Sequence, residues 1–76
     1  MQEFLEFVAK RLVEQPDNVT VHRETKEEKI VFRLEVAEPD IGKVIGRNGR
    51  TAQALRVLLA AVAAREGKRA ILEIAD

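Results

Sequence analysis

Two glycines three residues apart, Gly46 and Gly49, constrain this chain more than any other feature of its sequence. They separate a short aliphatic segment, Ile41–Ile45, from a long Ala- and Leu-rich segment, residues 50–65, and both segments have the composition of helices. Gly46 can adopt the left-handed angles that end a helix, and Gly49 lets the chain turn into the next one. The pattern predicts two helices joined by a tight loop whose backbone is open to close approach.

The rest of the chain predicts one more helix and three strands. Apolar side chains recur at helical spacing until Pro16 ends the first segment, and three later segments alternate apolar and polar residues or are rich in Ile and Val. The expected helix covers residues 2–14, and the expected strands cover residues 18–24, 29–37 and 69–75.

These elements predict a two-layer α+β domain in the order α-β-β-α-α-β. The polar turn at residues 25–28 makes the first two strands an antiparallel hairpin, and a right-handed crossover through two helices makes the second and third strands parallel. We expect a three-stranded mixed sheet covered on one face by three helices. Asp40 is expected to cap the helix Ile41–Ile45, and Phe4 and Phe32 are expected in the core.

Length and composition exclude several classes of protein. Seventy-six residues predict a single domain spanning residues 1–76. The absence of Cys and the presence of one His argue against disulfides, thiolate zinc sites and His-rich metal sites. The sequence has no Ser and no evident nucleophile–base pair, so we do not expect an enzyme. We also expect no cofactor and no small-molecule substrate. No apolar run could span a bilayer, and Glu3 stands where a signal peptide would be basic, so we expect a cytoplasmic protein.

The net charge is zero, with 13 Lys and Arg against 13 Asp and Glu, yet the charges are unevenly distributed. Residues 41–65 contain five basic residues and no acidic residue. An uneven field of this kind can steer an anionic partner to one side of a protein.

The arginines beside the glycines suggest what that partner is. Arg47 and Arg50 stand at the start of the second helix, where positive side chains oppose the helix dipole, and an external phosphate would remove this conflict. Lys43 and Arg56 add positive charge on either side. The alternative is a helix–turn–helix corner that needs glycine for its geometry alone. The glycine spacing does not fit the Rossmann fingerprint or the P-loop.

The stretch Val44-Ile45-Gly46-Arg47-Asn48-Gly49-Arg50-Thr51-Ala52 resembles the core of a KH domain in its bacterial type II form, whose element order is the one expected here. The resemblance covers the whole chain. The chain is similar to the small bacterial single-KH RNA-binding proteins of the KhpA (YlqC) family. Ala52 departs from the wider KH pattern, which has a large aliphatic residue there, and this limits the depth of the apolar groove.

The resemblance implies that the loop 46–49 clamps about four nucleotides of single-stranded RNA with low sequence specificity, as in an RNA chaperone or post-transcriptional regulator. The aliphatic residues would floor a groove for the bases, with residues 30–36 as its opposite wall. A second, larger KH-containing protein is implied as a partner. A protein-interaction module with a KH fold and a single-stranded DNA binder remain alternatives. The expected RNA-binding residues are Ile41, Lys43, Val44, Ile45, Gly46, Arg47, Asn48, Gly49, Arg50, Leu55 and Arg56.

The long helix is apolar almost all round, although a helix that covers a sheet needs only one apolar stripe. Close packing of small residues on the sheet would explain this, and so would a second buried face against another copy of the chain. We favour a homodimer, with Ala61 on the outward face.

Overall fold

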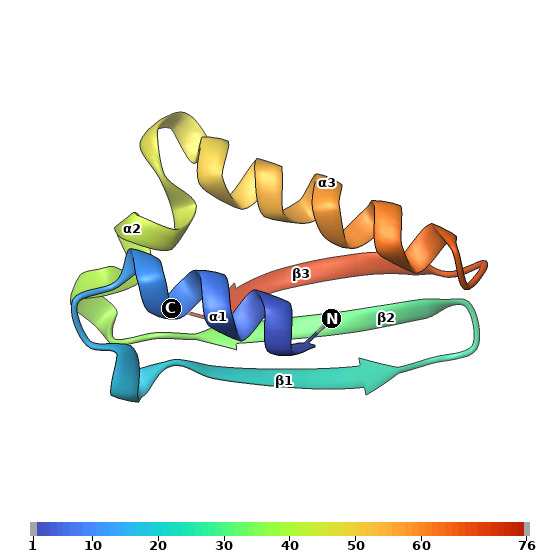
Figure 1. Cartoon of the computed structure of the whole chain (residues 1–76), viewed down its shortest axis with the longest axis horizontal. Coiled ribbons are helices and arrows are strands. Elements are labelled where there is room, and N and C mark those ends of the chain that lie inside the picture. The colour runs from blue at the N-terminus through green and yellow to red at the C-terminus, as the bar shows by residue number, and fades with distance from the viewer. Residues whose placement is uncertain (1, 76) are drawn as a thin grey trace.

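Three helices cover one face of a three-stranded sheet in the computed structural model, which describes residues 2–75 (Figure 1). The expected order α-β-β-α-α-β is confirmed, with short 3₁₀ turns at three of the connections. The helices and strands are α1 (Gln2–Leu12), β1 (Thr20–Thr25), β2 (Lys29–Glu35), α2 (Ile41–Ile45), α3 (Arg50–Ala64) and β3 (Arg69–Ala75).

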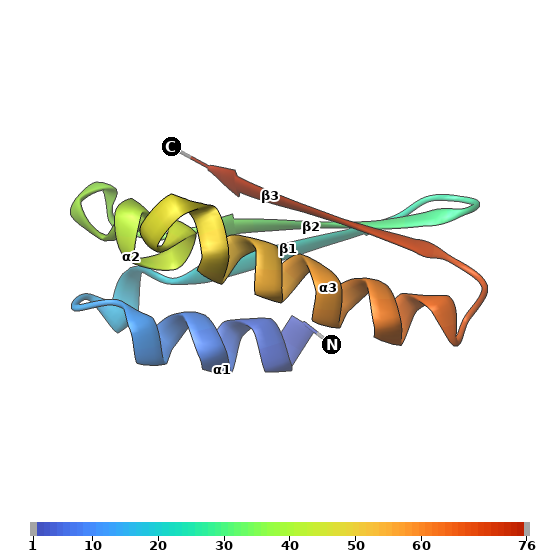
Figure 2. The same ribbon diagram turned by 90° about the horizontal axis from the view of Figure 1, so that it is seen from above.

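The sheet has the order β1-β2-β3 and is mixed, as expected. β1 pairs with β2 in antiparallel register and β3 pairs with β2 in parallel register. β2 is therefore the central strand, and β1 and β3 form the two edges. Figure 2 shows α1 and α3 running along the same side of this sheet, so the other side has no helix over it.

The core lies between the helices and the sheet. Ile30, Phe32 and Leu34 point from alternate positions of β2 toward the helices and are fully buried. Leu5 and Ala9, one turn apart on α1, and Leu59 on α3 close over them.

The expectation that Phe4 belongs to the core is wrong. α1 buries the side that carries Leu5 and Ala9, and Phe4 lies beside that stripe with 45% of its surface exposed. Helical periodicity alone places Phe4 on the apolar side, but residues at the margin of an apolar stripe need not be covered when the neighbouring helix is distant.

Asp40 does not cap α2 as the sequence suggested. It is the last residue of a 3₁₀ turn, Glu38–Asp40, and its side chain makes no capping hydrogen bond. Its carboxylate is buried and instead accepts hydrogen bonds from the backbone N–H groups of Glu14 at 3.2 Å and Gln15 at 3.0 Å. These two N–H groups lie just past the end of α1, so Asp40 ties that end to the start of α2. The same bonds explain why α1 ends at Leu12 rather than at residue 14.

The corner between α2 and α3 depends on glycine, as expected. Gly46 has φ 79° and ψ 173°, a region that other residues scarcely enter, and Gly49 is left-handed with φ 74°. The backbone of Gly46 lies against Thr51 in the first turn of α3, leaving no room for a Cβ atom. Asn48 is also left-handed, with φ 57°, which Asn tolerates better than most residues. The loop therefore has a defined backbone shape that its residue types favour.

Replacing Asp40 by Ala should destabilise the protein by about 3 kcal/mol, because two backbone N–H groups lose a charged acceptor inside the fold. Asp40→Asn should lie between the parent and Asp40→Ala, since an amide offers only one oxygen. Urea unfolding would measure both. Asp17→Ala is the matched control, because Asp17 is exposed, and it should change stability by less than about 0.5 kcal/mol. Equal effects of Asp17→Ala and Asp40→Ala would contradict the proposed tie.

Alanine at three glycines should rank in a fixed order of stability. Gly42→Ala should be neutral or stabilising by up to about 1 kcal/mol, because Gly42 is helical with free space around it. Gly49→Ala should cost about 1–2 kcal/mol for its left-handed angle alone. Gly46→Ala should cost more than Gly49→Ala, because the new methyl group also overlaps Thr51. Thermal unfolding of the three variants would test the order, and a Gly46→Ala variant as stable as Gly49→Ala would contradict it.

Candidate nucleic-acid interface

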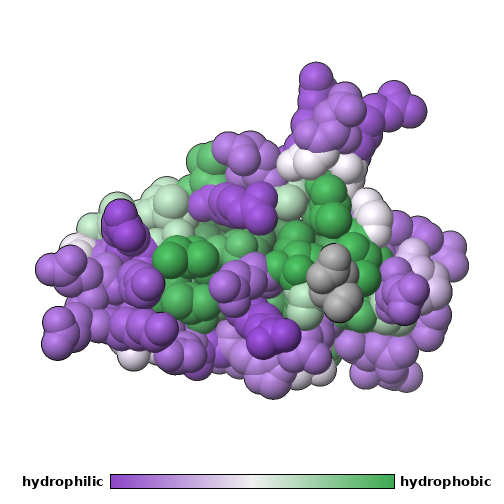
Figure 3. Space-filling view, turned by 180° about the vertical axis from the view of Figure 1, so that it is seen from behind, coloured by the Kyte–Doolittle hydropathy of each residue, from purple (hydrophilic) through white to green (hydrophobic). Residues whose placement is uncertain are grey.

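The loop between α2 and α3 projects from one end of the molecule. Arg47, Asn48 and Arg50 are all exposed. Figure 1 places this loop at the upper left, and Figure 3, which looks from behind onto the sheet side, shows it as a hydrophilic protrusion at the upper right. The loop is therefore accessible to a large partner from several directions.

The start of α3 is a positive pole without a side-chain cap. Gly49 occupies the N-cap position and offers no side-chain acceptor, and no acidic residue lies in the first turn of α3. Within residues 2–75, no carboxylate lies within 4.0 Å of the Arg47 or Arg50 guanidinium. The helix dipole and both arginines thus act together on whatever approaches the loop, and they favour an anion.

Two of the expected basic residues are directed elsewhere. Lys43 Nζ lies 3.5 Å from Glu14 Oε1 and 3.7 Å from Asp40 Oδ1, so its positive charge is paired with carboxylates of the protein itself. Arg56 Nη2 points to the backbone oxygen of Leu72 on β3 at 3.5 Å. Arg47 and Arg50 are the cations that the structure leaves at the loop itself.

The aliphatic residues expected in the groove fall into two groups. Ile41 is half-buried and Ile45 is 37% exposed, so both offer apolar surface beside the loop. Val44 is fully buried and Leu55 is only 3% exposed, so both belong to the core. Val44 and Leu55 therefore support the floor from below, and Ile41 and Ile45 are the residues that a base could touch.

The expectation that residues 30–36 form the opposite wall of the groove is wrong. β2 is the central strand, and its residues on the helix side are fully buried in the core. The strand that borders α3 at an open edge is β3, and the contact from Arg56 to Leu72 spans this border. β3 is thus the edge strand that lies next to α3. The strand pairing predicted from the sequence already implied this, because a strand that pairs with both of the others must lie in the middle of the sheet.

α1 and α3 enclose an apolar groove on the surface. It is lined by Phe4 from α1 and by residues from α3 that include Leu58, Ala61 and Val62. Phe4, Leu58 and Val62 are each more than 40% exposed. Ala61 is exposed too, as expected for an outward-facing residue. The long helix therefore carries a second apolar face that does not pack on its own sheet.

Other types of site find no support in the part of the chain that the structure describes. Residues 2–75 contain no group of three or more His, Asp or Glu residues arranged to hold a metal ion. His22 lies on the sheet side without helices, with Nε2 2.8 Å from Glu35 Oε2. No helix within residues 2–75 is long and apolar enough to cross a membrane.

Comparison with known proteins gives one consistent family. The family model described as the KH domain of KhpA/KhpB matches residues 2–74. "RNA-binding protein KhpA" of Chlamydia pneumoniae is 45% identical over 76 residues, covering 100% of this chain and 97% of the relative. The protein of the same name from Clostridium acetobutylicum is 47% identical over 74 residues, covering 97% of this chain and 99% of the relative.

A third relative gives the same result. The "RNA-binding protein KhpA" of Borreliella burgdorferi is 43% identical over 74 residues, covering 97% of this chain and 90% of the relative. No solved structure matches the chain. The element order, the Gly-x-x-Gly corner and these matches agree, and the chain belongs to the KhpA/KhpB family of KH domains.

Proposed function

We propose that the protein binds single-stranded RNA through the loop 46–49, with the RNA backbone over the start of α3 and bases on the aliphatic surface beside it. The relatives named above are called RNA-binding proteins, which supports RNA as the ligand. A loop that grips phosphates carries little information about sequence, so binding has low sequence specificity. Such binding suits an RNA chaperone or a post-transcriptional regulator.

The observation that carries this proposal is the pair of unneutralised arginines at the positive end of α3. A fold selected for stability alone would favour an acidic or hydroxyl side chain at this helix start. Here Arg47 and Arg50 occupy it, and no carboxylate of residues 2–75 is within 4.0 Å of either. A phosphodiester supplies the missing negative charge, and the backbone at Gly46 and Gly49 lets it come close.

We further propose that two copies of the chain associate through the apolar groove between α1 and α3. Exposed apolar side chains are continuous from Phe4 to Leu58 and Val62. α3 carries Arg50 and Arg56 but no acidic residue, so the face it turns to the groove offers apolar contact rather than charge pairing. A second copy presents the same apolar face and satisfies the two-fold symmetry that most homodimers use. Two loops held together would bind one RNA more tightly than a single loop.

Changing Arg47 and Asn48 together to Asp should abolish RNA binding and leave the fold intact. The two carboxylates repel phosphate, while acidic residues suit the positive end of α3. Circular dichroism would verify the fold, and filter binding with a labelled single-stranded RNA would measure affinity. The same titration with a DNA strand of equal sequence distinguishes RNA binding from general single-strand binding.

The matched control changes Asn18 and Arg23 to Asp. Both residues are exposed, and the pair makes the same two residue exchanges and the same change in net charge at a site away from the loop. This control should retain most of the RNA affinity. A folded Arg47→Asp, Asn48→Asp variant that binds as well as the control would disprove the role of the loop.

Ala61→Arg should convert a dimer into a folded monomer, because a charged side chain in the apolar groove cannot be buried without a partner charge. Sedimentation equilibrium at tens of micromolar protein would measure the mass of the parent and the variant. Ala60→Arg is the control, because Ala60 is exposed on α3 but does not line the groove. A parent protein that is already monomeric would refute the proposed dimer.

A further inference from the structure

The sheet face without helices carries a local conflict of charge at one end. The parallel register places Lys29 of β2 directly beside Arg69 of β3. Further along the same face, the register places Arg33 beside Glu73, and His22 pairs with Glu35. Opposite charges are thus neighbours in the middle of this face. Like charges on neighbouring strands are destabilising, and here they meet only next to the β1–β2 turn.

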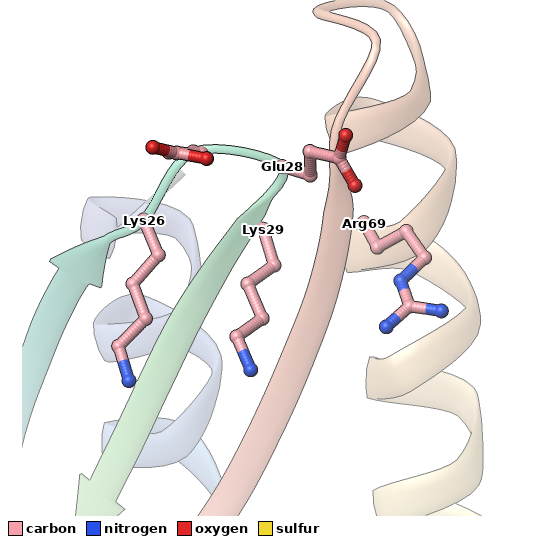
Figure 4. A pocket seen from close by; sticks show the side chains of 5 residues that line it. Lys26, Glu28, Lys29 and Arg69 are labelled. Atoms are coloured by element: carbon pink, nitrogen blue, oxygen red, sulfur yellow. The ribbon is translucent and has the colours of Figure 1, made fainter.

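The side chains at this end do not all share a direction. In Figure 4, Lys26 and Lys29 extend the same way over the strands, Arg69 turns outward from β3, and the carboxylate of Glu28 is directed toward β3. Lys26 has a partner, with Nζ 3.4 Å from Glu24 Oε1. Among residues 2–75, no carboxylate comes within 4.0 Å of the charged groups of Lys29 or Arg69.

The backbone holds these two residues together. The N–H group of Arg69 donates to the carbonyl oxygen of Glu28 at 2.9 Å, and the N–H group of Lys26 donates to the carbonyl oxygen of Lys29 at 2.8 Å. The strands therefore cannot separate at this point to relieve the repulsion. An external anion between the two side chains would relieve it, and a guanidinium beside an ammonium is well suited to the oxygens of a phosphate.

We propose that Lys29 and Arg69 form a second phosphate contact for the RNA that the loop 46–49 binds. The ligand is the phosphodiester backbone of a strand that continues beyond the loop, so this inference rests on the proposed function. Half-buried Val31 and Ile71 lie next to the pair on the same sheet face and offer apolar surface along the way.

The position of the pair determines the length of RNA required. The loop and the β1–β2 turn lie at opposite ends of the molecule, whose longest extent is 35 Å (Figures 1 and 3). At the ~3.4 Å per phosphate of a stacked strand, this extent corresponds to about ten nucleotides. Four nucleotides held in the loop cannot reach the pair, whereas a strand of about fifteen can.

The experiment compares two lengths of RNA on a double variant, Lys29→Gln with Arg69→Gln. Affinity for a four-nucleotide strand should be unchanged. For a fifteen-nucleotide strand, the log–log slope of affinity against salt should become shallower by about 1.4, because two phosphates lose their cations at about 0.7 each. Arg69→Gln alone should give about half of this change. Thermal unfolding should show no loss of stability, since the variant removes a repulsion.

The control removes two cations elsewhere, Lys10→Gln with Arg23→Gln, and has the same net charge. It should leave the salt slope for the long strand near that of the parent. Equal slopes for the control and the Lys29, Arg69 variant would overturn this inference. A different result would contradict the proposed function itself. That result is unchanged binding of the four-nucleotide strand by the Arg47→Asp, Asn48→Asp variant. Restoring charge with Lys29→Arg and Arg69→Lys should restore the slope, and failure to do so would also count against a phosphate contact.

Discussion

The buried carboxylate of Asp40 joins the segment after α1 to the start of α2. It accepts two backbone hydrogen bonds from the segment after α1 and lies within 3.7 Å of Lys43 on α2. Burying a carboxylate without hydrogen-bond donors would destabilise the folded state by several kcal/mol. The two backbone N–H groups and the Lys43 ammonium are therefore what allows Asp40 to be buried. α2 leads directly into the Gly-x-x-Gly loop, so Asp40 helps to fix the position of the loop relative to α1, together with the Lys43–Glu14 ion pair.

Local patterns in the sequence predicted most of the fold. Alternation in β2 corresponds to a real buried face, and Gly46 and Gly49 have the positive φ angles that their spacing suggested. Asp40 could not be predicted in the same way. Its partners lie more than twenty residues earlier in the chain, and sequence spacing gives no information on such contacts.

The site was predicted less completely than the fold. The family pattern identified the loop, but it did not indicate that Lys43 is paired with acidic residues or that Leu55 is in the core. Phe4 was predicted to be buried but is exposed. The apolar spacing of a helix does not reveal which of its apolar residues a neighbouring helix will cover. Each of these facts depends on how separate elements pack. The net charge is equally uninformative, because a total of zero conceals two arginines at the loop that no carboxylate of residues 2–75 approaches within 4.0 Å.

The parallel pairing of β3 with β2 has a consequence for how the chain folds. Both α2 and α3 lie between these strands in the sequence. The two strands can therefore pair only when the intervening segment is already compact or when the chain loses the conformational entropy of closing a long loop. The hairpin of β1 and β2 requires only a short turn and can form early. Contacts made by β3 should accordingly be weak in the folding transition state, and Leu72 should influence the unfolding rate more than the folding rate.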